Sequence, residues 1–153
     1  MRNSDEITLI AESRLEEARI LLDNGKCEGA FYLAGYSVEL MLKAQVCKHL
    51  QIPSLFDGRN CEVEGIADIK RAVQTHQLKP LLILSGLFQK FNNDKAGNLI
   101  LAETYALLDG WNETVRYRAI NSQSKKTVEE LIQLLEIDKE GKNKGLLVWV
   151  KSQ

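Results

Sequence analysis

One stretch of this chain constrains its fold more than any other. Residues 29–44 read GAFYLAGYSVELMLKA, and Glu39 and Lys43 are their only charged side chains. A helix that is apolar on nearly all sides has to be surrounded by other helices, so this stretch predicts the central element of an all-α fold. We expect the helix to span residues 27–50, because Pro53 cannot continue it.

Small residues within this helix predict a close neighbour. Ala30, Ala34 and Gly35 leave room for another helix to approach its backbone. A glycine inside a helix costs about 1 kcal/mol relative to alanine. We therefore expect a close contact at Gly35 that only glycine allows.

Apolar residues at helical spacing, separated by turn signals, predict further helices around this one. The expected helices span residues 4–23, 66–74, 75–84, 99–109 and 125–138. An irregular loop is expected at residues 55–65, and residues 111–123 fit either irregular chain or a weakly started helix. The tail at residues 146–150, LLVWV, fits a short helix or an extended segment docked on the core, and we favour the helix.

Two local signals set the ends of the first expected helix. Asn3 and Glu6 have the spacing of a capping box, with asparagine as the cap. Asn24 and Gly25 follow the last apolar position and can adopt the left-handed conformation that ends a helix.

Composition limits the classes of function. The 153 residues fit a single domain, residues 1–153, and 20 Lys and Arg balance 21 Asp and Glu. This balance argues against a constitutive electrostatic nucleic-acid binder, although it permits a local basic patch. We find neither a leader-like N-terminus nor an apolar run long enough to cross a bilayer, so we expect a cytoplasmic protein without membrane association.

The cysteines do not indicate a metal centre. Cys27, Cys47 and Cys61 are odd in number and lack the Cys-x-x-Cys spacing of zinc sites. We expect reduced thiols, no metal and no cofactor.

Three stretches carry a resemblance to a known family. Residues 18–22 and Gly25 lead into GAFYLAGYSVELMLKA, residues 75–78 read THQL before a pair of leucines, and Trp111 precedes Arg-Tyr-Arg at residues 116–118. In this order they resemble the HEPN domains, small helical proteins of bacteria and archaea. The resemblance covers about residues 4–150, and the second-helix motif is its most specific part.

The resemblance implies an up-down bundle of four to five helices, with short extra helices between the second and third long ones. Such domains usually form homodimers, and many are metal-independent RNA endonucleases. Others pair with a minimal nucleotidyltransferase in toxin–antitoxin modules. A homodimer, a nucleotidyltransferase partner, and RNA or a nucleotide as ligand are therefore the expected partners.

The ribonuclease motif of this family is an Arg followed by a His after four to six intervening residues on the last helix. The resemblance assigns the Arg half to Arg116 or Arg118. No His stands at the permitted positions, which hold Asn121, Ser122 and Gln123 after Arg116, and Gln123, Ser124 and Lys125 after Arg118. The usual motif is therefore lacking.

Arg71 and His76 have the spacing of that motif but lie in a different segment. They are a second candidate catalytic pair. The alternative is that His76 is a first-turn residue of a short helix with a local hydrogen bond.

Glu39 and Lys43 have the spacing and order of a helical ion pair, which would satisfy two charges on a buried helix. Donors from a neighbouring helix could also satisfy Glu39. Alternatively, Glu39 faces a polar cleft shared with Arg116 and Tyr117, which makes these three the candidate catalytic residues. Trp111 and Tyr117 are either core anchors or stacking platforms for a base. Arg116 and Arg118 either bind a phosphate or pair with Glu113 or solvent. The candidate ligand-binding residues are Arg116, Tyr117, Arg118 and Lys43.

Three functions remain open at this point. The leading one is a dimeric HEPN module that binds a nucleotide or a partner protein. The second is an RNA endonuclease toxin with a non-standard active site, so whether the chain is an enzyme stays open. The third is a ligand-sensing helical module.

Overall fold

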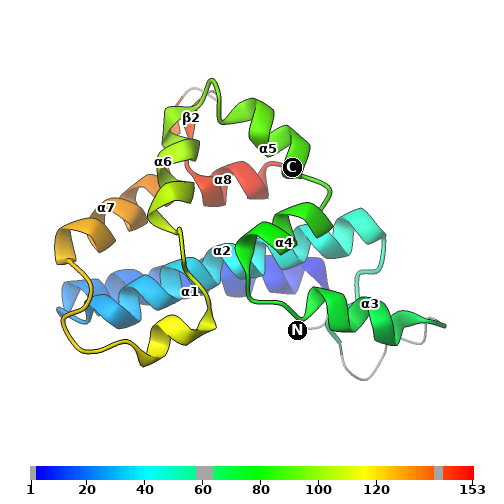
Figure 1. The fold of residues 1–153 in the computed structure, drawn as a ribbon, viewed down its shortest axis with the longest axis horizontal. Coiled ribbons are helices and arrows are strands. Elements are labelled where there is room, and N and C mark those ends of the chain that lie inside the picture. The colour runs from blue at the N-terminus through cyan, green and yellow to red at the C-terminus, as the bar shows by residue number, and fades with distance from the viewer. Residues whose placement is uncertain (1–2, 58–63, 140–142) are drawn as a thin grey trace.

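Two long antiparallel helices, α1 (Ser4–Asp23) and α2 (Cys27–Leu50), lie side by side along the length of the molecule (Figure 1). The computed structural model describes residues 3–57, 64–139 and 143–153. Both helices have the predicted bounds. The Asn3 side chain accepts the Glu6 N–H at 2.9 Å, and Gly25 adopts the left-handed conformation in the turn, as the capping signals predicted.

The apolar helix α2 is the central element, as predicted. Every residue from 37 to 47 is buried, including the polar ones. Val38, Met41 and Ala44 are completely inaccessible to solvent. The remaining elements therefore enclose the second half of α2, while its first half keeps some side chains partly open to solvent.

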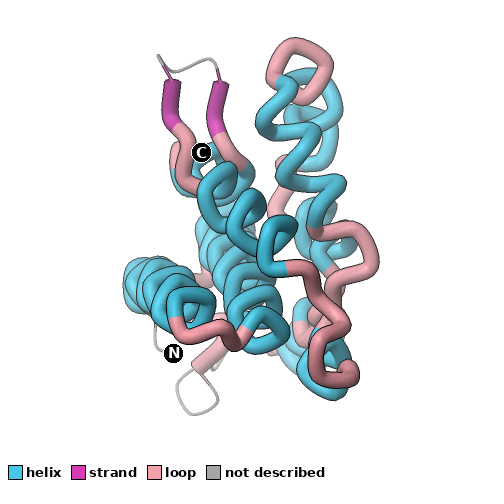
Figure 2. Tube along the Cα trace, turned by 90° about the vertical axis from the view of Figure 1, so that its left-hand side faces the viewer, coloured by secondary structure: helices cyan, strands magenta, loops and turns pink. Residues whose placement is uncertain are grey.

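Shorter elements cover the α1–α2 pair. In chain order they are α3 (Ile66–Val73), α4 (Leu78–Leu84), α5 (Phe88–Asp94), α6 (Leu99–Leu107), the 3-10 helix η1 (Glu113–Tyr117), α7 (Lys125–Leu135), the strands β1 (Asp138–Lys139) and β2 (Asn143–Lys144), and α8 (Leu146–Lys151). The two strands pair antiparallel and form a small hairpin at one end of the molecule (Figure 2). The described chain is therefore mostly helical, as predicted.

Two elements were not predicted from the sequence. Helix α5 includes residues 92–94, whose polar sequence Asn-Asn-Asp predicted a break between helices. The burial of Phe91 explains why a helix forms there. The hairpin interrupts what the pattern predicted as helix up to residue 138. The tail does form a helix, α8, as expected, and the loop predicted at residues 55–65 lies partly outside the described residues, as does Cys61.

The start of α4 differs from the prediction in a way that matters for the site. Thr75 does not cap the helix, because α4 begins only at Leu78. The Thr75 hydroxyl accepts the Gln77 N–H at 3.1 Å and stabilises a turn before the helix. His76 consequently lies in a non-helical link and not in a first helical turn.

None of the helices in the described part of the chain combines the length and the apolar character needed to span a bilayer.

Gly35 has the close contact that its position predicted, but with a side chain and not with a second backbone. A Cβ at this position would lie 2.2 Å from Nε1 of Trp111, whose side chain is 4 % exposed. The indole therefore lies directly on the α2 backbone. This contact holds the segment before η1 against the central helix.

We predict that Gly35→Ala destabilises the protein although alanine favours helix. Overpacking against the indole costs about 1–3 kcal/mol, and the gain in helix propensity of about 1 kcal/mol offsets part of it. The matched control is Gly29→Ala, also in α2, where the new Cβ would meet only the flexible end of Leu21 at 3.0 Å. Urea denaturation should give a lower midpoint for Gly35→Ala than for Gly29→Ala, and equal midpoints would contradict the prediction.

Candidate functional site

Four polar or aromatic side chains line one side of the largely apolar middle of helix α2. Tyr32, Tyr36, Glu39 and Lys43 follow one another at spacings of four, three and four residues, which places them on the same helix face. We call these four residues the polar face of α2. The tyrosines are half-buried and the two charged residues are buried.

The Glu39 carboxylate is the buried charge at the centre of this face. Its side chain is 1 % exposed, and Oε1 accepts a hydrogen bond from Nζ of Lys43 at 2.6 Å. Nδ1 of His76 lies 3.0 Å from Oε1 and 3.2 Å from Oε2. These two partners offset the cost of burying the carboxylate. The ion pair between Glu39 and Lys43, predicted from their spacing, is confirmed.

His76 joins the site through this carboxylate and not through Arg71. The Arg71 side chain is 82 % exposed and pairs with Asp68, so the Arg71–His76 spacing does not bring the two residues together. The contact between His76 and Glu39 joins residues 37 positions apart. Sequence reasoning missed this pair, and the only signal for it was that a buried carboxylate requires several donors.

Aromatic rings continue the site toward the start of α2. The rings of Tyr36 and Tyr32 stack with centroids 5.9 Å apart, and Trp111 stacks on Tyr32 at 6.2 Å. Burial, and after it the charge of Glu39, raises the pKa of the Tyr36 phenol, so the hydroxyl stays protonated. Trp111 is the core anchor of this row, which agrees with one of the two roles considered for it.

Arg116 lies beside this row, next to Tyr32. Its guanidinium Cζ is 4.9 Å from the centroid of the Tyr117 ring. Hydrogen bonding to Tyr117, and after it to Tyr32, raises the pKa of Arg116. Tyr117 is 75 % exposed and so is not a core anchor. The Arg118 guanidinium lies 6.0 Å from the Phe31 ring.

The structure therefore connects most of the predicted site residues, although not as a single cleft. Glu39 contacts Lys43 and His76 directly, while Arg116 and Tyr117 reach the same face of α2 through Tyr32 and Tyr36. In Figure 1 the segment leading into η1 (yellow) and the segment between α3 and α4 (green) both cross α2. These two segments bring Arg116 and His76 to the polar face.

A cavity of about 260 Å³ adjoins the site beside Trp111. Its walls come from the segment that follows His76 and from the segment that precedes Arg116. The lining residues are Gln77, Leu78, Lys79, Pro80, Tyr105, Leu108, Asp109, Gly110, Trp111 and Asn112. The surface next to the aromatic row is therefore hollowed.

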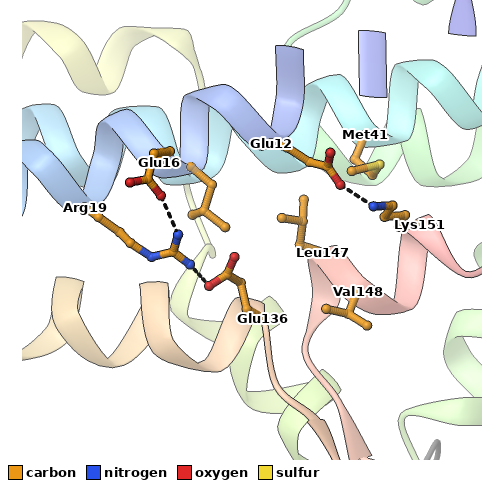
Figure 3. Close-up of a pocket in the computed structure, with 9 residues that line it drawn as sticks. Glu12, Glu16, Arg19, Met41, Glu136, Leu147, Val148 and Lys151 are labelled. Atoms are coloured by element: carbon orange, nitrogen blue, oxygen red, sulfur yellow. Dashed lines mark hydrogen bonds and ion pairs between the residues drawn. The ribbon is translucent and has the colours of Figure 1, made fainter. Parts of the chain in front are cut away.

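A larger cleft, of about 400 Å³, lies between α1, α2, α7 and α8 (Figure 3). Leu15, Met41, Leu147 and Val148 supply its apolar walls. Both cations on its rim are already bound to carboxylates: Lys151 to Glu12, and Arg19 to Glu16 and Glu136. An anionic ligand would have to displace these carboxylates. For such a ligand Arg116, beside Tyr32 of the polar face, is the better candidate.

Within the described residues, no three His, Cys, Asp or Glu side chains are grouped closely enough to hold a metal ion. Cys27 and Cys47 are both buried.

No protein-family model matches this chain, and neither does any curated protein or solved structure.

We predict that Lys43→Met destabilises the protein by about 3 kcal/mol, because it leaves the buried Glu39 carboxylate without its ammonium partner. The control is Lys90→Met, which removes the lysine of a pair with the same spacing, Lys90 and Asp94. The Lys90 side chain is 53 % exposed, so its loss should cost less than about 1 kcal/mol. Urea denaturation measures the loss of unfolding free energy in each variant. Similar losses would contradict the prediction that burial makes the Glu39 pair more important for stability.

Proposed function

We propose that this chain is a HEPN-type helical bundle whose polar α2 face binds a nucleotide or single-stranded RNA. The stacked row of Trp111, Tyr32 and Tyr36, with Arg116 beside Tyr32, is the observation that carries the proposal. The resemblance of the α2 sequence to the second helix of HEPN domains supports the family assignment.

The chemistry of Arg116 supports a phosphate ligand. A guanidinium presents several N–H donors in one plane, a geometry that matches phosphate oxygens. The neighbours of Arg116 are the aromatic side chains of Tyr117 and Tyr32. Within the described residues Arg116 forms no ion pair with a carboxylate, so it can bind a phosphate without giving one up.

The tyrosines support a base as the second part of the ligand. A base stacked on an aromatic side chain contributes about 1–3 kcal/mol to binding, largely irrespective of its sequence. Tyr117 is exposed next to Arg116, and Tyr32 and Tyr36 are half-buried. A site with Arg116 as its cation and with aromatic rings for stacking does not require a basic protein, and the net charge of this chain is −1.

Arg116→Ala should weaken binding of a fluorescein-labelled single-stranded RNA by about tenfold or more, because it removes the phosphate contact. The matched control is Arg71→Ala, which removes an exposed arginine far along the chain that pairs with Asp68. Fluorescence anisotropy measures the dissociation constants. Equal weakening by both variants, or no binding by the wild type, would refute the proposed site.

A second candidate function, metal-independent RNA cleavage, is favoured by the contact of His76 with the buried Glu39. A solvent-accessible imidazole oriented by a carboxylate is the usual arrangement of a general base. Incubation of unmodified RNA with each protein tests this function. Cleavage by the wild type that is abolished in both Arg116→Ala and His76→Ala would establish the endonuclease. Intact RNA would exclude it.

We further propose that the chain acts as a homodimer and pairs with a nucleotidyltransferase in a toxin–antitoxin module, as HEPN proteins do. Light scattering should give a mass near twice 17.3 kDa. A clean monomer at tens of micromolar would contradict the dimer. Co-purification with a nucleotidyltransferase encoded in the adjacent reading frame tests the partner.

A further inference from the structure

The side-chain cluster around Glu39 fixes which nitrogen of His76 faces a ligand. A lysine ammonium has donors only, so beside Lys43 the Glu39 carboxylate acts as an acceptor. Nδ1 of His76 lies within hydrogen-bond distance of both carboxylate oxygens, at 3.0 and 3.2 Å. Nδ1 must therefore carry the ring proton and donate a hydrogen bond to this carboxylate.

The other ring nitrogen then has one defined property. In a neutral imidazole with the proton on Nδ1, Nε2 is an acceptor with a lone pair. The His76 side chain is 43 % exposed, whereas those of Glu39 and Lys43 are only 1 % and 8 % exposed. Of these three groups, the imidazole is the one that a ligand can reach.

His76 also lies near the aromatic row. Tyr36 precedes Glu39 by three residues on the same face of α2. The Glu39 carboxylate lies within hydrogen-bond distance of the His76 ring, and its charge helps to raise the pKa of the Tyr36 phenol. Tyr32, which Arg116 approaches, precedes Glu39 by seven residues, a rise of about 10 Å along the helix. One nucleotide can span this distance from its phosphate to the edge of its base.

We propose that His76 is a specificity-determining residue that selects bases with an amino group at C4 of a pyrimidine or C6 of a purine. Cytosine and adenine present an N–H₂ donor where uracil and guanine present a carbonyl oxygen. The Nε2 lone pair accepts the amino hydrogen, and it repels the carbonyl. This inference rests on the proposed nucleotide-binding function and names the class of nucleotide that the site takes.

The test compares two ligands that differ at the base edge in this group and in N3, which is an acceptor in cytosine and an N–H donor in uracil. Labelled oligocytidylate and oligouridylate of equal length, with 2′-O-methyl riboses that prevent cleavage, are titrated with the full chain at about pH 8. We expect cytidylate to bind about fivefold to tenfold more tightly, the range that one hydrogen bond gained against one left unpaired provides. His76→Ala should bring the two dissociation constants together.

Glu39→Gln gives a more specific result. A glutamine side chain can donate to Nδ1 from its amide, which moves the imidazole proton to Nε2 and turns that nitrogen into a donor. The preference should then shift toward uridylate. Since this variant disturbs a buried pair, its fold is checked by circular dichroism, and the result with His76→Ala decides the case if it does not fold.

The outcomes separate this inference from the function on which it rests. Equal binding of both oligonucleotides, or a preference that persists in His76→Ala, overturns the selection by His76 and leaves the binding site standing. Failure of the folded wild type to bind either oligonucleotide overturns both. A preference for cytidylate that disappears in His76→Ala supports the inference.

Discussion

A single buried carboxylate organises the part of this molecule where function is expected. Glu39 lies in the middle of the central helix, where an unpaired charge would cost several kcal/mol. Lys43 comes from the next turn of the same helix, while His76 has to be brought in by a separate segment. The non-helical link before α4 provides for this, because it places the imidazole over α2 and not along the surface of a short helix. The need to pair the Glu39 charge thus accounts for the position of the link before α4, which lies far from Glu39 in the sequence.

At the other end of the same face, the determining contact is steric. Gly35 leaves the α2 backbone bare, and the Trp111 indole occupies that space. The indole in turn stacks on Tyr32 and holds the chain just ahead of η1, from which Arg116 extends. Charge pairing at one end and close contact at the other place a histidine and an arginine along one side of a single helix.

The fold could be predicted from the sequence wherever a pattern is local. The bounds of α1 and α2, the asparagine cap and the burial of α2 all follow from periodicity and capping within a few residues. Helix α5 was missed because its last turn is made of polar residues, and its stability comes from the burial of Phe91 in the tertiary structure. The ion pair of Glu39 with Lys43 is local and was predicted, whereas the contact of Glu39 with His76 depends on how two remote segments meet. Spacing along the chain suggested Arg71 as the partner of His76, but the exposed end of α3 directs that arginine elsewhere.

The link that carries His76 has a consequence for the integrity of the molecule. It is anchored on one side by the buried Leu78, Leu81 and Leu82 of α4, and its imidazole covers a carboxylate that is otherwise enclosed. Any local opening that lifted α4 from the central helix would admit water to the buried ion pair, and would carry the imidazole away from the Glu39 carboxylate in the same movement. Closure of the domain over this ion pair is in this way tied to one short piece of chain.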